Sequence, residues 1–418
     1  MSRQRLRVAL FGTYPRGVGY PRAQVLGEAL RTAGAEVVEI HAELGLSSRG
    51  RVGVARGPLR AASFAGRYLL ATRKLPRLLR EAGRLDVVLV GPTGYLDAIL
   101  ARRILRRMDE PRPLLVFDPF FTLTETLVED RKVVGPSSLR ARLFGWLERK
   151  SAHAADALLA DTAVHADHFA HTFDFDRARI ATVPVGHVGT NAPRPDPAPS
   201  PGEPLRALYL GTFIPLHGLE TVVRAGELLR KEGIEILLAG EGQELPRILR
   251  LVAERAPSAV RILQGFRTGA ELEALVSRCK VALGVFGGGS KASRVVPCKV
   301  HDALARGTAV VTGDTVAARE LLTSGTNALL VPPGDAEALA HALLRLKRDP
   351  ALLARLSSEG RRLHEERLSS STIGRDLVRD LNVWLGRDAA PESGGAEDGE
   401  DPPLDLTPRS GQRVGSLS

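Results

Sequence analysis

The chain contains one internal repeat, which limits the folds it can adopt. From Arg7 it reads RVALFGTYPRGVGYPRAQVLGEALRTAGAEVVEI, and from Arg206 it reads RALYLGTFIPLHGLETVVRAGELLRKEGIEILLAG. When these arginines are aligned, Gly12 coincides with Gly211. Each copy has the pattern of a short apolar strand, a glycine turn, an amphipathic helix and a second strand, which opens a doubly wound fold. The repeat therefore predicts two Rossmann-like domains in tandem.

A proline-rich segment separates the two copies. Residues 191–204, NAPRPDPAPSPGEP, contain six prolines. Proline cannot continue a helix or a central strand, so this segment is expected to be a linker. We expect an N-terminal domain at 1–190, a second domain at 205–366 and a helix at 367–386 that crosses back to the first domain. The acidic segment 387–418 is rich in Gly, Pro and Ser and is expected to be a disordered tail.

Further short apolar runs continue the strand pattern in both halves. In the first half they are DVVLVG, PLLVFD, ALLADT and RIATVPVG, and in the second they are IEILLAG, AVRILQG, KVALGVFG, TAVVTG and NALLVPPG. Helical stretches separate these runs, which predicts parallel sheets with ligands at the carboxyl ends of the strands. The expected fold class is α/β, with two doubly wound sheets whose strand ends face each other across a cleft.

Charge is unevenly distributed along the chain. The formal net charge is +10, and between Arg49 and Arg84 there are nine arginines and one lysine but a single acid, Glu81. A surface this basic fits an anionic partner, such as phospholipid headgroups, nucleic acid or a phosphorylated substrate. It fits a solvated, arginine-rich face equally well.

Several classes of protein and site are disfavoured by what the sequence lacks. No window has the roughly 18–20 uninterrupted apolar residues of a membrane-spanning helix, and the apolar run before Gly12 is too short for a secretory signal. We therefore expect a cytoplasmic protein. Neither GxGxxG nor GxxxxGK[ST] occurs, and two cysteines alone cannot build a disulfide framework or a four-ligand zinc site. His165, His168 and His171 recur every three residues, which we interpret as a solvated helix face rather than a metal site.

The second half carries a pattern suited to phosphate binding. In GGGSKASRVVPCK a glycine run follows the strand KVALGVFG, and Lys291, Arg294 and Lys299 surround the start of the next expected helix. Backbone amides, cations and a helix N-terminus together make a site for a diphosphate. Asp302, one helical turn beyond Lys299, is placed to accept hydrogen bonds from ribose hydroxyls. Glu320 opens a further helix and is expected to point towards the cleft.

Four ordered motifs in the second half carry a family resemblance. They are GTFIPLHGLETVVRA, LLAGEGQEL, PCKVHDALARGTAVV and ARELLTSGTNALLVPPGDAEAL, and they span about Leu205 to Leu346. They resemble the donor domain of retaining GT-B glycosyltransferases in the large nucleotide-sugar-dependent group 1, family 4-like, and the first domain resembles this group more loosely. The resemblance implies a GT-B fold, a nucleotide-sugar donor and retention of configuration, with no metal or other cofactor. The donor-binding residues it implies are Gly211, Thr212, His217, Gly240, Gly242, Lys291, Arg294, Lys299, Asp302 and Glu320.

The chain departs from that group in two places. The group often has two glutamates spaced by seven residues, and here Arg294 and Asp302 stand at those positions. The usual arginine and lysine after the first strand of the domain are replaced by Thr212 and His217. The phosphate charge must then be met by the cations of the glycine-rich loop. His217 has a second interpretation as the cap of the helix that follows it.

In the first domain, the loop GTYPRGVGYPR is expected to face the cleft. Gly12, Tyr14, Arg16 and Arg22 belong to it and are candidate contacts to acceptor or phosphate. Asp118 ends the strand PLLVFD, where an acceptor-side base would lie, and it could instead cap the following turn. The resemblance implies that the donor's own phosphate oxygen assists departure and attack. The electrostatic work then falls on cations around the leaving diphosphate.

The stretch Arg51–Arg84 mixes leucines and aromatics with arginines. This pattern is typical of a basic amphipathic surface that rests on an anionic membrane and receives a lipid-linked acceptor. Pro58 and Pro76 interrupt it, which predicts one central helix flanked by shorter pieces. The alternative is an ordinary domain helix whose arginine stems cover apolar surface.

We interpret the chain as a glycosyltransferase that moves a sugar from a nucleotide donor to a saccharide or lipid-linked acceptor held by the first domain. The alternative is a noncatalytic nucleotide- or carbohydrate-binding protein of the same fold, which the missing glutamate favours. Retention of Lys299, Asp302 and Glu320 argues against that alternative. Nucleic-acid binding ranks below both, because the basic stretch carries few aromatics and no known binding module.

Overall fold

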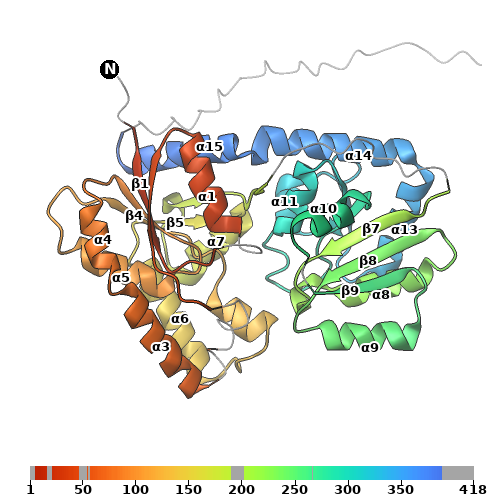
Figure 1. Ribbon diagram of the computed structural model, residues 1–418, viewed down its shortest axis with the longest axis horizontal. Coiled ribbons are helices and arrows are strands. Elements are labelled where there is room, and N and C mark those ends of the chain that lie inside the picture. Colours follow the sequence, from red (N-terminus) through yellow and green to blue (C-terminus); the bar gives the residue numbers. More distant parts are fainter. Residues whose placement is uncertain are drawn as a thin grey trace, which may run out of the picture.

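The computed structural model describes residues 5–16, 21–46, 54, 57–189, 202–265 and 267–387. They form two domains that stand side by side, each a six-stranded sheet covered by helices on both faces (Figure 1). This is the α/β arrangement of two doubly wound domains that the repeat predicts. Most of the linker expected at 191–204 and of the tail expected at 387–418 lies outside the described residues.

The first domain contains a parallel sheet with the strand order β2-β1-β3-β4-β5-β6. Strands β3 and β5 are buried along their whole length, as continuous apolar runs in a sheet covered on both faces should be. The elements in chain order are β1 (Arg7–Gly12), α1 (Pro21–Thr32), β2 (Glu36–His41), α3 (Pro58–Thr72), α4 (Leu75–Glu81), β3 (Val87–Val90), α5 (Tyr95–Leu105), β4 (Leu114–Phe117), η2 (Glu125–Asp130), α6 (Leu139–Ala152), β5 (Ala157–Ala160), α7 (Ala163–Phe173), η3 (Arg177–Arg179) and β6 (Ile180–Thr182).

The second domain has the strand order β12-β11-β10-β7-β8-β9, also parallel. From β7 the chain moves outward to β8 and β9, and it then returns to the other side of β7 to form β10. The elements in chain order are β7 (Leu205–Leu210), η4 (Pro215–His217), α8 (Leu219–Leu228), β8 (Ile234–Gly240), α9 (Leu245–Arg255), β9 (Val260–Gln264), α10 (Gly269–Ser277), β10 (Val281–Leu283), α11 (Cys298–Ala305), β11 (Ala309–Gly313), α12 (Val316–Leu321), β12 (Leu329–Val331) and α13 (Ala336–Arg348).

The last helices run from the second domain back to the first (Figure 1). After α14 (Pro350–Leu363) and the short π-helix η5 (His364–Leu368), α15 (Ser370–Trp384) packs against α1. A Cβ on Gly374 would lie 2.0 Å from the carbonyl oxygen of Ala29, so the two helices meet backbone to backbone. The indole N–H of Trp384 donates to the carbonyl oxygen of Ala178 at 3.2 Å.

The basic stretch of the first domain has the central helix and the shorter following piece that its sequence predicts. Most of the segment before the central helix lies outside the described residues. In its described part it forms two helices, α3 and α4, separated by a turn at Arg73 and Lys74. Pro58 and Pro76 each lie in the first turn of one helix, where proline's missing N–H is not needed. Among the helices of the described residues, none has the length and apolarity to cross a bilayer.

Candidate active site

The strand order of the second sheet reverses between β7 and β10, and open α/β sheets bind ligands outside the carboxyl ends of the strands at such a point. The loops after these two strands pack directly on each other. Gly218 has a φ of 61°, and a Cβ there would lie 2.5 Å from the backbone nitrogen of Gly287. Position 218 therefore accepts glycine alone. The PLHG turn and the glycine run, which are distant in sequence, form one structure.

Lys299 lies in the first turn of α11, with its ammonium group buried at this crevice. Nζ is 3.7 Å from the centroid of the Tyr209 ring, and a Cβ on Gly211 would lie 3.2 Å from it. Within the described part of the chain, Nζ has no hydrogen-bond partner. Burial lowers the pKa of Lys299 to about 7. The N–H groups of this buried amine can therefore donate hydrogen bonds to an anionic ligand.

Lys291 and Arg294 reach across to the first domain instead. Nζ of Lys291 donates to Oγ1 of Thr126 at 2.8 Å, and the guanidinium of Arg294 pairs with the carboxylate of Glu125. Both partners belong to the π-helix η2. The three cations expected to surround one diphosphate are therefore divided. Of the three, Lys299 is the one without a hydrogen-bonding partner among the described residues.

Asp302 and Glu320 also meet groups of the first domain. Oδ1 of Asp302 lies 2.7 Å from Nδ1 of His187. The two carboxylate oxygens of Glu320 accept hydrogen bonds, each 2.7 Å long, from the backbone N–H groups of Ala163 and Val164 at the start of α7. They satisfy amides that have no partner within that helix. Glu320 thus links the domains rather than offering a free carboxylate to the cleft.

The remaining donor-side residues shape the crevice. His217 is buried, and its Nδ1 lies 2.6 Å from the carbonyl oxygen of Thr212. Burial, followed by the charge of Lys299, holds the pKa of His217 well below its ordinary value, so the imidazole is neutral at pH 7. Cβ atoms on Gly240 and Gly242, at the end of β8, would collide with the backbone of the loop that follows β7. These residues set the path of the loop.

On the first-domain side, Asp118 follows β4 and is completely buried. Its Oδ2 accepts a hydrogen bond from Nε of Arg22 at 2.9 Å, and Nη1 of Arg22 donates to the carbonyl oxygens of Val183 and Pro184. Burial raises the pKa of Asp118, and the charge of Arg22 opposes that rise. A general base must reach the proton it removes. This placement therefore does not support Asp118 as an acceptor-side base or Arg22 as a phosphate contact.

The described part of the acceptor-side loop makes contacts within its own domain. Gly12 ends β1 with a φ of 125°, and a Cβ there would meet a buried carboxylate at 2.6 Å. Tyr14 packs in the core of the first domain, and Arg16 pairs with Glu39. Residues 17–20 lie outside the described residues. A contact between this loop and an acceptor stays a prediction.

The histidines of α7 do not form the solvated face that their spacing suggested. His165 is fully buried, with Nδ1 2.6 Å from the carboxylate of Asp161. Nε2 of His168 lies 3.4 Å from Glu125, and His171 is exposed. His165 and His168 therefore meet polar partners, and the rest of the inner side of α7 packs in the apolar core of the first domain. Within the described ranges, no group of His, Cys, Asp and Glu side chains is arranged to hold a metal ion.

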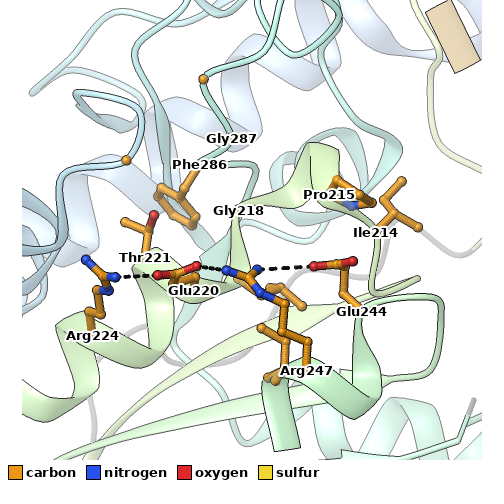
Figure 2. Close-up of a pocket in the computed structure, with 14 residues that line it drawn as sticks. Ile214, Pro215, Gly218, Glu220, Thr221, Arg224, Glu244, Arg247, Phe286 and Gly287 are labelled. Carbon is orange, nitrogen blue, oxygen red and sulfur yellow. Dashed lines mark hydrogen bonds and ion pairs between the residues drawn. The ribbon is translucent and has the colours of Figure 1, made fainter. Parts of the chain in front are cut away.

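A pocket of about 300 Å³ borders the same glycine loops (Figure 2). Figure 2 shows the carboxylate of Glu220 between Arg224 and Arg247, and Arg247 also pairs with Glu244. These ion pairs neutralise the charged lining of the pocket, and Lys299 does not line it. None of these four residues is among the donor-binding residues predicted from the sequence. The sequence does place Glu220 and Arg224 one helical turn apart, a spacing that favours an ion pair on a helix.

Two family models match the chain, one in each domain. The model of glycosyl transferases group 1 matches residues 204–349, and the model of the glycosyl transferase 4-like domain matches residues 16–186. The chain is a group 1 glycosyltransferase. In this glycosyltransferase, the group 1 match contains the crevice at β7 and β10, and the 4-like match contains first-domain residues that contact the second domain. Comparison of its sequence with curated proteins finds no match.

Solved structures share the architecture of this glycosyltransferase. Sucrose-phosphate synthase from Thermosynechococcus elongatus has a TM-score of 0.67 at 18% identity, covering 92% of this chain and 100% of that one. HepE from Anabaena in complex with UDP-glucose has a TM-score of 0.62 at 13% identity, and the match covers 90% of this chain and 100% of HepE. The lipopolysaccharide outer core galactosyltransferase WaaB in its apo form has a TM-score of 0.61 at 13% identity, and the match covers 90% of this chain and 99% of WaaB. At these identities the likeness establishes the fold, which is GT-B.

Proposed function

We propose that this glycosyltransferase takes a nucleotide-sugar donor into the crevice between β7 and β10, where Lys299 neutralises the leaving diphosphate. The observation that carries the proposal is the buried ammonium group of Lys299 beside Gly211, without a hydrogen-bond partner in the described part of the chain. The N-terminus of α11 adds backbone N–H groups at the same place. HepE, which shares the fold, was solved with UDP and with UDP-glucose, and this supports the donor class.

We propose that transfer retains the configuration of the sugar. The bond between C1 and the diphosphate oxygen breaks, and the acceptor oxygen bonds to C1 from the same face. The acceptor proton passes to the leaving diphosphate. The motif resemblance supports this course, and so does the burial of Asp118, which leaves it unable to serve as an acceptor-side base. Lys299 counters the charge that grows on the diphosphate.

We propose that the reaction needs no metal ion. A divalent cation in other transferases neutralises the diphosphate, and a fixed ammonium group can supply the same charge. Lys299 is placed to do so, and Lys291 lies in the neighbouring glycine-rich loop. A chelator is therefore expected to leave turnover unchanged.

The acceptor that we propose is a lipid-linked saccharide, held by the first domain at an anionic membrane surface. Helix α3 contains no acidic residue, and Leu59, Leu69 and Leu70 on it are 86%, 69% and 62% exposed. Exposed leucines beside arginines are typical of helices that lie on anionic membranes. The name of the structural neighbour WaaB, a lipopolysaccharide outer core galactosyltransferase, supports an acceptor of this class.

The test is a turnover assay with UDP-, GDP-, dTDP- and ADP-sugars, with the product anomer read by NMR. One nucleotide class should support transfer with retention, in the presence or absence of a chelator. Lys299→Ala should lower kcat by about 10²- to 10³-fold. Arg345→Ala, which removes an exposed cation of α13, should leave it unchanged. A product of inverted configuration would overturn the proposed course, and full activity of Lys299→Ala would overturn the donor site.

A further inference from the structure

A second pocket lies in the first domain, and no residue of the glycine loops lines it. It has a volume of about 580 Å³ and lies between the C-terminal halves of α5 and α6. Five cations line it, two from α6 and three from α5 and the turn that follows. No carboxylate belongs to the lining. These cations are Arg102, Arg103, Arg106, Arg149 and Lys150.

Most of this positive charge is unbalanced. Arg102 pairs with Asp156 and donates to the carbonyl oxygen of Ala154. The side chains of the other four cations form no hydrogen bond or ion pair with the described residues, and Nζ of Lys150 lies 5.6 Å from the centroid of the Trp146 ring. A helix C-terminus favours a cation by about 0.3–1 kcal/mol, which explains a cation at the end of each helix. It does not explain why two helices bring four unpaired cations to one groove.

Exposed apolar side chains lie on α6, one of the two helices that form the groove. Among the described residues, eight large hydrophobic side chains are exposed, and six of them lie on α3 and α6. Trp146 at the rim of the groove is 54% exposed, and Leu143, one turn before it, is 56% exposed. Helix α3 is joined to α5 by a hydrogen bond of 2.8 Å from Tyr68 to Asp97. The rim that α6 contributes to the cationic groove thus carries an exposed tryptophan and leucine, and α3 carries exposed leucines of its own.

We infer that this groove binds the phosphate of an anionic phospholipid headgroup. The planar guanidinium groups of Arg103, Arg106 and Arg149 match the geometry of phosphate oxygens, and the ammonium group of Lys150 adds a fourth charge. Trp146 and the leucines enter the interface between headgroups and acyl chains, where tryptophan is enriched. A free phosphate would need the cations but not the exposed apolar rim. The inference rests on the proposed function in one respect, the placement of the first domain at a membrane.

The position of the groove separates it from the chemistry of sugar transfer. A helix that follows a strand in a parallel unit runs back towards the amino ends of the strands. The C-terminus of α5, and that of α6, which precedes β5, therefore lie at the edge of the sheet opposite the cleft. Substitutions in the groove should leave transfer to a soluble acceptor unchanged.

The experiment is cosedimentation of the full chain with phosphatidylcholine vesicles, with and without phosphatidylglycerol. The groove variant is Arg103→Gln/Arg149→Gln, which changes one residue from each helix. The control is Arg250→Gln/Arg345→Gln, which removes the same charge from exposed positions of the second domain. We expect the groove variant to bind phosphatidylglycerol vesicles about 30-fold more weakly than the wild type. We expect the control to bind as the wild type does, and all variants to give the same transfer rate on a soluble acceptor.

A second measurement reports contact at the groove itself. In a Trp384→Phe background the fluorescence comes from Trp146, and it should shift to the blue on phosphatidylglycerol vesicles. A groove variant that binds these vesicles as tightly as the wild type overturns the inference. So does stabilisation of the wild type, but not of the groove variant, by inorganic phosphate without any binding to vesicles, because the site then takes a free anion. Loss of vesicle binding in Leu69→Ser/Leu70→Ser tests the proposed contact through α3 separately.

Discussion

Lys299 has surroundings that differ greatly from those of an ordinary lysine. Its ammonium group lies against the ring of Tyr209 and beside Gly211, and burial lowers its pKa to about 7. Burial therefore favours the neutral amine in the free protein much more than it would be favoured in an exposed lysine. A bound diphosphate supplies hydrogen-bond acceptors and negative charge, which raise the pKa again. Donor binding at this site is thus linked to proton uptake.

We predict that the affinity for the nucleotide sugar falls about tenfold for each pH unit above about 7, because binding then requires a proton that the free amine lacks. Lys299→Met keeps an apolar stem but cannot be charged, so it should bind weakly and without this pH dependence. Titration calorimetry in buffers of different ionisation enthalpy measures both the affinity and the protons taken up. A wild-type affinity that is constant above pH 7 contradicts the prediction.

The ion pair of Arg22 and Asp118 gives a second prediction at the residue scale. Both side chains are buried, and removing one partner of a buried pair leaves an uncompensated charge. Asp118→Asn should lower the free energy of unfolding by about 3–5 kcal/mol, measured by urea denaturation. Its pH–rate profile should keep the shape of the wild type, because Asp118 positions other groups and does not carry a proton in the reaction. A variant that is fully stable but loses one limb of the profile would restore Asp118 as the base.

At the scale of elements, the start of α7 is joined to α12 through one side chain. Glu320 accepts hydrogen bonds from the first two amides of α7, a role that Ser, Thr or Asp of the same chain segment usually fills. Thr162, the residue before α7, uses its side chain both to cap His165 and to donate to the carbonyl oxygen of Arg294. This helix terminus is therefore completed by residues of the other domain.

Glu320→Ala is expected to reduce stability by about 1 kcal/mol, since two helix amides lose their acceptor. For domains of this size the corresponding decrease in Tm is about 2–4 °C. Glu254→Ala, an exposed position on α9, serves as the control and should leave Tm unchanged. The dissociation constant of the donor should be similar in both variants. A large loss of donor affinity in Glu320→Ala with an unchanged Tm would instead favour the donor-binding role predicted for Glu320 from the sequence.

At the scale of the whole molecule, polar contacts join the two domains directly. Arg294 pairs with Glu125, which is buried, and hydrogen bonds to His168 and other polar partners hold the pKa of Glu125 far below its ordinary value against the effect of burial. A carboxylate whose pKa is lowered by folding stabilises the folded state at pH values above the pKa it has in the unfolded chain. This stabilisation is lost as the pH falls through the pKa it has in the folded protein. Because the folded pKa is so low, this contact persists under mildly acidic conditions.

Glu125→Gln should loosen the contact between the domains, because it leaves Arg294 as a charge without its partner in a largely buried place. Small-angle scattering should show a larger radius of gyration for this variant than for the wild type. The double variant Glu125→Gln/Arg294→Gln removes both charges, so its effect on stability should be smaller than the sum of the two single effects. Strictly additive effects would mean that the two side chains do not interact between the domains.

The fold could be predicted from the sequence because its signals are local. Apolar runs, glycine turns and the repeat that aligns Gly12 with Gly211 are each local to one β-α-β unit. Gly12 ends β1 and Gly211 directly follows β7, and both have a positive φ. The site was predicted less well because its contacts form between distant segments. The glycine-rich loop identified Lys299, but nothing near Arg294 in the sequence indicates that Glu125 neutralises it. The spacing of His165 and His168 is equally compatible with solvent and with the polar partners that cover them.

The path of the chain through α15 determines which segments fold as a unit. Ile373, Leu377 and Leu381 are buried in the same core as α1, so the first domain is assembled from two separate stretches of sequence. The second domain is therefore an insertion within the first, attached to it at both ends. A fragment ending after β6 would lack this helix and expose the apolar face of α1 to water. Expression of the first domain alone thus requires a gene that keeps α15 and joins it through a linker to the end of β6.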